Sequence, residues 1–201
     1  MSIHKKVLVG VTLMIAAILA PQAYAAGDAE RGEVLADTCL GCHGIPGYRN
    51  AYPSYRVPKL GGQHQEYLVI ALNGYKSGQR QHLTMQAQMA SLSDQDIADL
   101  AAYFAALGEP VQGAAAAENA AGAEKATVCA ACHGPNGVST SPNWPVLAGQ
   151  HQDYLQTALA QYAAGDRKDP VMAGQVTNLT AEDIADLAAY FAAQSGLFSI
   201  K

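Results

Sequence analysis

The sequence predicts an all-α protein that contains two copies of one domain. Residues 60–107 align without a gap with residues 147–194, and 26 of the 48 positions are identical. Apolar residues recur at helical spacing, and no segment shows the alternation expected of a strand. One cysteine motif occurs in each half, CLGCH at 39–43 and CAACH at 129–133. A repeat of this length indicates a duplicated domain and not a solenoid unit.

Each copy is expected to contain about three main helices. The first leads into the cysteine motif, and the second carries apolar residues at helical spacing. The third begins at a capping-box-like sequence, with Ser93 or Thr180 as the N-cap. The expected ranges are 28–39, 64–78 and 93–106 in the first copy, and about 118–129, 151–165 and 180–193 in the second.

The first 25 residues have the features of a secretory signal. Lys5 and Lys6 precede an apolar run at 7–20, and the sequence AYA at 23–25 supplies small residues for cleavage. The run is shorter than the roughly 20 residues that a bilayer span needs. We therefore expect a cleaved signal and export to the periplasm, with an uncleaved membrane anchor as the alternative. The expected division is signal peptide 1–25, first domain 26–110 and second domain 111–201.

Charge and composition limit the classes of partner and cofactor that the protein is expected to bind. Without the signal, the chain has 10 basic and 17 acidic residues, a net charge of −7. Nucleic acid is not expected as a partner, because binding of its phosphates needs a basic face. The hydrophobic half of the chain is rich in alanine and has only three Phe and one Trp. Two small domains with such cores need a staple or a large buried cofactor.

The cysteine motifs indicate what that cofactor is. They comprise Cys39 and Cys42 before His43, and Cys129 and Cys132 before His133. A disulfide over so short a span stabilises little, a redox C-x-x-C expects a βαβ setting, and paired zinc knuckles normally lie closer than these two motifs. C-x-x-C-H instead places two thiols to bond one haem, with the next imidazole facing the iron. The sequence predicts two covalently bound haem c groups, with His43 and His133 as the proximal ligands.

The repeat also selects candidates for the sixth iron ligand. Met85 and Met172 occupy the same aligned position, whereas Met89 aligns with a valine and His82 with an aspartate. One aligned histidine pair remains the alternative, His64 and His151. A methionine ligand raises the potential relative to bis-histidine ligation and leaves no open coordination position. Methionine ligation would therefore favour electron transfer over catalysis.

With these motifs, the chain resembles the dihaem cytochrome c4 family. Each C-x-x-C-H domain has P-x-L-x-G-Q before the middle helix and L-S/T-x-x-D-I-A-D-L-A-A-Y-F near its end, and the resemblance extends from residue 27 to near 198. It implies two class I cytochrome c domains related by a pseudo-twofold axis, with haem propionates near their interface. It also implies a periplasmic electron carrier, often membrane-associated, between the cytochrome bc complex and a haem–copper terminal oxidase.

The resemblance assigns roles to further residues. Met85 and Met172 match the distal methionines of the family. Pro58 and Pro145 match the proline whose carbonyl accepts the N–H of the proximal imidazole, a bond that orients the ligand. Two aligned arginines just before the methionines are expected to neutralise haem propionates, Arg80 and Arg167.

Two other functions stay open at this point. The first is a dihaem cytochrome subunit of a dehydrogenase such as a sulfide-oxidising flavoenzyme, with the tyrosine- and arginine-rich loop within 44–60 as its docking surface. The second is a haem-based enzyme or gas sensor, which would need an exchangeable sixth ligand. The main expectation is an electron-transfer protein that is not an enzyme and whose partners are redox proteins.

Overall fold

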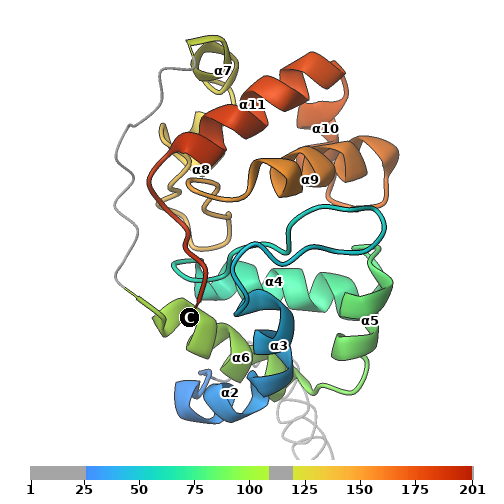
Figure 1. Ribbon diagram of the computed structural model, residues 1–201, viewed down its shortest axis with the longest axis vertical. Coiled ribbons are helices and arrows are strands. Elements are labelled where there is room, and N and C mark those ends of the chain that lie inside the picture. Colours follow the sequence, from blue (N-terminus) through green and yellow to red (C-terminus); the bar gives the residue numbers. More distant parts are fainter. Residues whose placement is uncertain (1–25, 109–119, 201) are drawn as a thin grey trace, which may run out of the picture.

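The protein consists of two helical domains stacked one above the other (Figure 1). The computed structural model describes residues 26–108 and 120–200. The predicted signal, and the predicted helix start near residue 118, lie outside these ranges. The first domain contains α2 (Ala29–Leu35), α3 (Asp37–His43), α4 (Gln65–Lys76), α5 (Leu83–Met89) and α6 (Asp94–Ala106). The second contains α7 (Ala120–Lys125), α8 (Ala130–His133), α9 (Gln152–Ala164), α10 (Pro170–Val176) and α11 (Ala181–Ala193).

The prediction of an all-α fold is confirmed. In the described part of the chain, extended pairing is limited to isolated bridges between single residues. The last helix of each copy organises its domain, since α6 packs against α2 and α4, and α11 packs against α7 and α9. Both of these helices begin with the predicted capping box, Ser93 with Asp96 and Thr180 with Asp183. A capping box satisfies two N–H groups that the helix start would otherwise leave unpaired.

Two details of the predicted helices are wrong. The helix expected at 28–39 is interrupted at Ala36, whose N–H contacts the carbonyls of both Gly32 and Glu33. Such shared bonds tighten a final helical turn. In addition, the three helices predicted for each copy do not include α5 and α10, the short helices that carry Met85 and Met172. Each is seven residues long, which is too short for a helical period to be recognised.

The two domains contact each other through a reciprocal pair of buried glutamines. The Gln63 amide donates to the Val146 carbonyl (3.0 Å) and accepts from the Val146 N–H (2.9 Å). Gln150 makes the same pair of bonds to the backbone of Lys59, at 3.0 and 2.9 Å. Because the two glutamines are equivalent in the repeat, the interface has approximate twofold symmetry.

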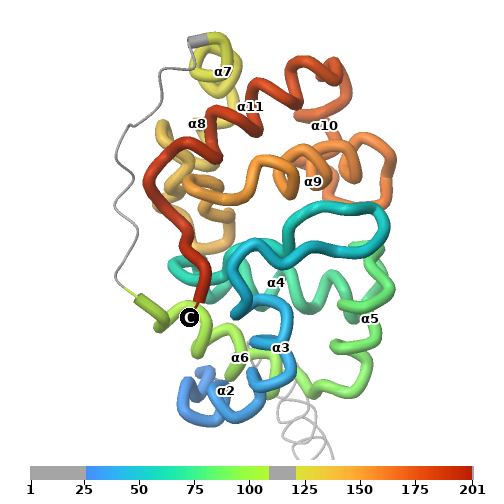
Figure 2. Tube along the Cα trace, in the orientation of Figure 1, coloured from blue at the N-terminus to red at the C-terminus, as the bar shows by residue number. Residues whose placement is uncertain are grey.

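The C-terminal segment crosses from the second domain back to the first, as the red trace in Figure 2 shows. Leu197 packs with Val146 and Ala148, and the Phe198 N–H donates to the Gly61 carbonyl (3.2 Å). Ile200 is 5% exposed and completes the core of the first domain. A side chain at residue 61 would overlap the Phe198 ring, so glycine is required there. The first domain therefore needs residues from the end of the chain.

Candidate functional site

One cavity of about 670 Å³ runs through both domains and across their interface. It is lined by the same set of predicted site residues from each copy: Cys39, Cys42, His43 and Met85, and Cys129, Cys132, His133 and Met172. The rest of the wall includes core aliphatic and aromatic side chains such as Leu68, Leu100 and Phe191. The small cores expected from the composition are thus built around one large internal space.

The two histidines of the cysteine motifs are held in the same way. His43 Nδ1 lies 2.9 Å from the Pro58 carbonyl, and His133 Nδ1 lies 3.0 Å from the Pro145 carbonyl. A carbonyl can only accept, so Nδ1 carries the proton and Nε2 keeps its lone pair. Burial lowers the pKa of both histidines, which favours the neutral imidazole. A neutral imidazole oriented by a carbonyl is the form that binds a metal.

The cysteines are paired neither with each other nor with a metal-binding set of side chains. None of the four forms a disulfide in this structure, and each side chain is partly buried. Among residues 26–108 and 120–200, no three His, Cys, Asp or Glu side chains are placed to hold a bare ion. This arrangement does not support the disulfide and zinc alternatives. In each copy, two thiols and one imidazole nitrogen beside the apolar wall of the shared cavity form a donor set that fits covalent haem.

The methionines sit at equivalent places on α5 and α10. The Met85 N–H donates to His82 Nδ1 (3.2 Å), and the Met172 N–H donates to Asp169 Oδ1 (2.9 Å). His82 and Asp169 are therefore the N-caps of the two methionine helices. His82, which aligns with this aspartate in the repeat, is partly buried against Tyr75. Met89 is 1% exposed and belongs to the packing, as its alignment with Val176 indicated.

A cluster of two arginines and four tyrosines lies where the domains meet. Arg80 and Arg167 face each other in an antiparallel bridge, flanked by the bonds Gln81 N–H to Asp166 carbonyl (3.0 Å) and Lys168 N–H to Gln79 carbonyl (2.8 Å). Each guanidinium stacks on two tyrosine rings at 5.3–5.8 Å. The four tyrosines, which all line the cavity, are Tyr67, Tyr75, Tyr154 and Tyr162.

These arginines are buried cations without a carboxylate partner. Arg80 is 8% exposed and Arg167 is 5% exposed. Within the described ranges, neither guanidinium forms an ion pair with an aspartate or a glutamate. Burying an unpaired charge is costly, so an anionic group in the cavity would complete this environment.

The alternative ligands His64 and His151 point to the interface and not to the methionine side of the cavity. His64 Nδ1 lies 2.9 Å from the Trp144 carbonyl of the other domain. Neither histidine lines the large cavity. Both are N-cap residues of the middle helices, which places them beside the interdomain glutamines.

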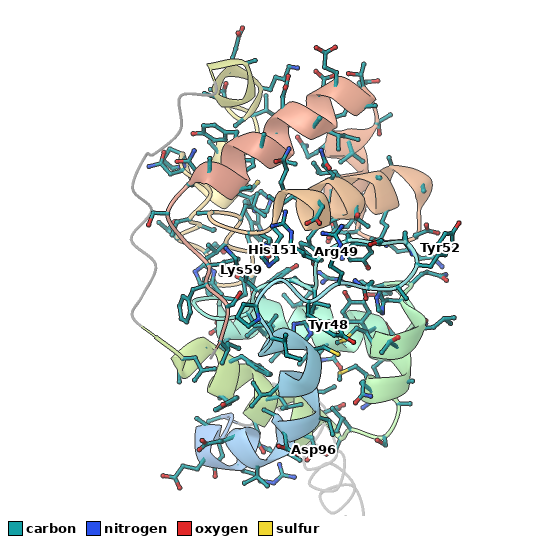
Figure 3. The ribbon with its side chains drawn as sticks, in the orientation of Figure 1. Tyr48, Arg49, Tyr52, Lys59, Asp96 and His151 are labelled. Carbon is teal, nitrogen blue, oxygen red and sulfur yellow. The ribbon has the colours of Figure 1, made fainter. Side chains whose placement is uncertain are left out.

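The arginine-rich loop of the first copy also belongs to the interface. Arg49 and Arg56 both form ion pairs with Asp153 on α9, at 3.0 and 3.1 Å. Tyr55 is buried against Tyr154, whereas Tyr52 is 96% exposed at the outer end of the loop (Figure 3). The arginines of this loop are therefore paired within the molecule, whereas Tyr48 and Tyr52 keep exposed side chains.

The interdomain glutamines are interface residues that the sequence reasoning missed. They lie in GQHQ, a stretch that recurs unchanged at 62–65 and 149–152. Its identity in two copies was the available signal. Its meaning appears only in the fold, because each glutamine binds the backbone of the other copy.

The fold and the paired attachment sites define a two-domain c-type cytochrome. Residues 29–108 and 118–195 each match the family model "Cytochrome c". The chain is 42% identical over 204 residues to cytochrome c4 of Azotobacter vinelandii, which covers 90% of this chain and 95% of that protein. The crystal structure of reduced recombinant cytochrome c4 from Pseudomonas stutzeri superposes with a TM-score of 0.69 at 34% identity, covering 86% of this chain and all of that one.

The chain belongs to the cytochrome c4 family, as the resemblance of its motifs predicted. It is a dihaem electron-transfer cytochrome with two covalently bound haem c groups, and its four cysteines fit the attachment motifs. It is also 33% identical over 180 residues to a thiosulfate dehydrogenase electron acceptor of Thiomonas intermedia, covering 83% of this chain and 80% of that protein. Across the two described ranges, no helix combines the length and hydrophobicity of a membrane span.

Proposed function

We propose that this protein is a periplasmic carrier that moves single electrons between respiratory components and has no catalytic site of its own. The observation that carries the proposal is the shared cavity, which collects two thiols, one oriented imidazole and one thioether from each copy. Haem c supplies the one-electron ferric–ferrous chemistry when bound. Relatives named cytochrome c4 support the carrier role.

In this proposal, the residues of each copy have separate tasks. Cys39, Cys42, Cys129 and Cys132 attach the two cofactors. His43 and His133 are the proximal ligands, and the carbonyls of Pro58 and Pro145 orient them. Met85 and Met172 would supply the thioether ligand of each iron, and a thioether favours the reduced iron and excludes exogenous ligands.

Arg80 and Arg167 are proposed to hold the carboxylates of the two cofactors at the interface. A guanidinium is always charged and presents donors in a fixed planar arrangement that suits carboxylates. Tyrosine rings surround each arginine and keep its side chain in place. In addition, Arg80 donates to the Tyr67 hydroxyl at 3.1 Å, and Arg167 donates to the Tyr154 hydroxyl at 3.2 Å. The antiparallel bridge brings the two arginines together, so both cofactors would have their acidic edges at one seam.

The partners in this proposal are redox proteins, with the cytochrome bc complex as donor and a haem–copper oxidase as acceptor. A second assignment is acceptor for a dehydrogenase, which the similarity to a thiosulfate dehydrogenase electron acceptor favours. Peripheral association with the membrane fits either role. Reduction kinetics with purified donor complexes distinguish the two, because the physiological donor should reduce the protein faster than the other donors tested.

A short set of measurements tests the carrier assignment. The mature protein should show the mass of the chain cleaved after Ala25 plus two haem groups. The ferric form should show the weak band at the red end of the visible spectrum that is typical of methionine-ligated haem, and the ferrous form should not bind carbon monoxide. Ready binding of carbon monoxide to the native protein would instead identify a sensor or an enzyme.

A further inference from the structure

A second, smaller cavity lies at the seam between the domains. Its volume is about 340 Å³. The first domain contributes Arg56 and Lys59, and the second contributes residues 149–152, which include His151. Alanines of α11 form another part of its wall, Ala189, Ala192 and Ala193. Figure 3 shows Lys59 and His151 next to each other at this seam, with Arg49 nearby. The cavity thus has a basic side and an apolar side.

Positive charge exceeds negative charge around this cavity. Arg49 and Arg56 share a single carboxylate, that of Asp153. The Lys59 ammonium donates to the Gly149 carbonyl at 2.5 Å, and the described residues give it no carboxylate partner. Three cations therefore meet one carboxylate among the described residues, in a chain whose formal net charge is −5. Such a local excess attracts anions.

We propose that the seam cavity binds a small oxyanion, a phosphate or sulfate group, between Lys59 and Arg56. Ammonium and guanidinium groups are the usual side-chain donors to such groups. The alanine side provides no side-chain donor, so the charged contacts of the anion would come from the basic side. The first and second domains each supply part of the site, and occupancy would tie them together.

Occupancy of this site would also affect the cofactors, a consequence that rests on the proposed function. Lys59 lines the large cavity as well as the small one, so its charge is shared between them. An anion on Lys59 would offset that charge and favour ferric iron, which lowers the reduction potential. By linkage, the oxidised protein would bind the anion more tightly than the reduced protein.

His151 provides a direct reporter of binding. Burial, followed by the charges of Lys59 and Arg56, lowers the pKa of His151 to about 4. The imidazole is therefore neutral at pH 7. A neighbouring anion would raise this pKa and move the ring resonances in the NMR spectrum. The His151→Asn variant assigns these resonances.

The test uses the holoprotein in its ferrous, diamagnetic state. Sodium sulfate or inorganic phosphate is titrated against chloride at constant ionic strength, and the His151 resonances are followed. We expect a saturable shift, together with a lower midpoint potential in sulfate than in chloride. Lys59→Gln should weaken the anion affinity about tenfold, the value of one charge-assisted hydrogen bond. Arg56→Gln should weaken it similarly.

Lys76→Gln is the matched control, because Lys76 pairs with Asp94 at 3.0 Å and lies on neither cavity. It should leave the affinity unchanged. Vesicles with anionic phosphatidylglycerol, compared with neutral phosphatidylcholine, distinguish a lipid headgroup from a free ion as the source. The proposal fails if neither free anions nor anionic vesicles shift His151, or if Lys59→Gln responds like the parent. Failure of the carrier assignment would appear separately, in the haem mass and spectrum.

Discussion

The two copies hold their methionine helices with different caps. In the second copy, Asp169 accepts from the Met172 N–H, and in the first copy His82 accepts from the Met85 N–H. A carboxylate at a helix N-terminus interacts favourably with the helix dipole, and a neutral imidazole lacks that charge. The comparison shows that both copies have a hydrogen-bond acceptor at this N-cap position. The strength of the cap differs between the copies.

A second contrast concerns how each domain fixes its first helix. The last helix of each copy presents an aspartate pair, Asp96 and Asp99 or Asp183 and Asp186. Arg31 binds the first pair, and Lys125 binds the second at 2.8 and 2.6 Å. These cations do not occupy equivalent positions in the repeat. The ion-pair arrangement is thus retained although the residue that supplies the cation has changed.

Replacement of the methionines should have the largest effect, a change in the reduction potential of one domain relative to the other. Met85→His and Met172→His each replace the proposed thioether ligand by imidazole, which stabilises ferric iron. Each should lower the potential of its own domain on the order of 0.2 V, within the roughly 0.8 V that axial ligands span. Spectroelectrochemical titration resolves the two transitions and shows which copy has the higher potential. A variant with both transitions unchanged would mean that the exchanged methionine is not a ligand.

The C-terminal segment contributes a core residue to the first copy. Ile200 comes from the end of the second copy but packs in the core of the first. Ile200→Ala should lower the free energy of unfolding by about 2–4 kcal/mol, the usual cost of such a cavity. Hydrogen exchange should localise the loss to α4 and α6.

Ser199→Ala is the matched control, since Ser199 is adjacent and is not part of that core cluster. Its free energy of unfolding should stay close to that of the parent. A loss that appeared in α9 and α11 instead would contradict the assignment of Ile200 to the first domain.

Short sequence patterns predicted the features that depend on one copy alone. The C-x-x-C-H motifs, the capping boxes at Ser93 and Thr180, and the aligned Met85 and Met172 all lie in short stretches whose residue types limit the chemistry. The repeat added information, because it separated positions that both copies need from positions that vary. That is why Met89 could be assigned to packing before the fold was known.

Contacts between the copies could not be predicted in the same way. Gln63 binds residue 146 and Gln150 binds residue 59, so each partner is a backbone group far away in the sequence. The return of Ile200 to the first domain has no periodic signal either. The role of His82 was missed because the helix that it caps is only seven residues long. These features depend on tertiary packing, which a single sequence does not display.

Exchange of the two caps should have a smaller effect than loss of Ile200. Asp169→Ala removes the cap of α10 and should cost about 1 kcal/mol. His82→Asp gives the first copy the cap of the second and should stabilise α5 by several tenths of a kcal/mol, through the helix dipole. The measurement is the rate at which added imidazole displaces each methionine, which should rise at Met172 and fall at Met85. Equal rates in all variants would show that the caps do not control these helices.

A small acid dependence of stability is expected from one histidine of the aligned pair. Burial and nearby cations lower the pKa of His151 from 6.5 to about 4, so the unfolded chain takes up a proton more readily than the folded one. The stability that depends on neutral His151 is therefore complete above pH 6.5 and is lost as the pH falls toward 4. Because the side chain is partly exposed, the loss should be about 1 kcal/mol or less.

The measurement is denaturant unfolding of the parent and of His151→Asn between pH 7 and pH 4. As the pH falls, the free energy of unfolding should decline less steeply in His151→Asn than in the parent. His64→Asn gives the contribution of the other copy. A decline as steep as that of the parent would mean that protonation of His151 does not oppose folding.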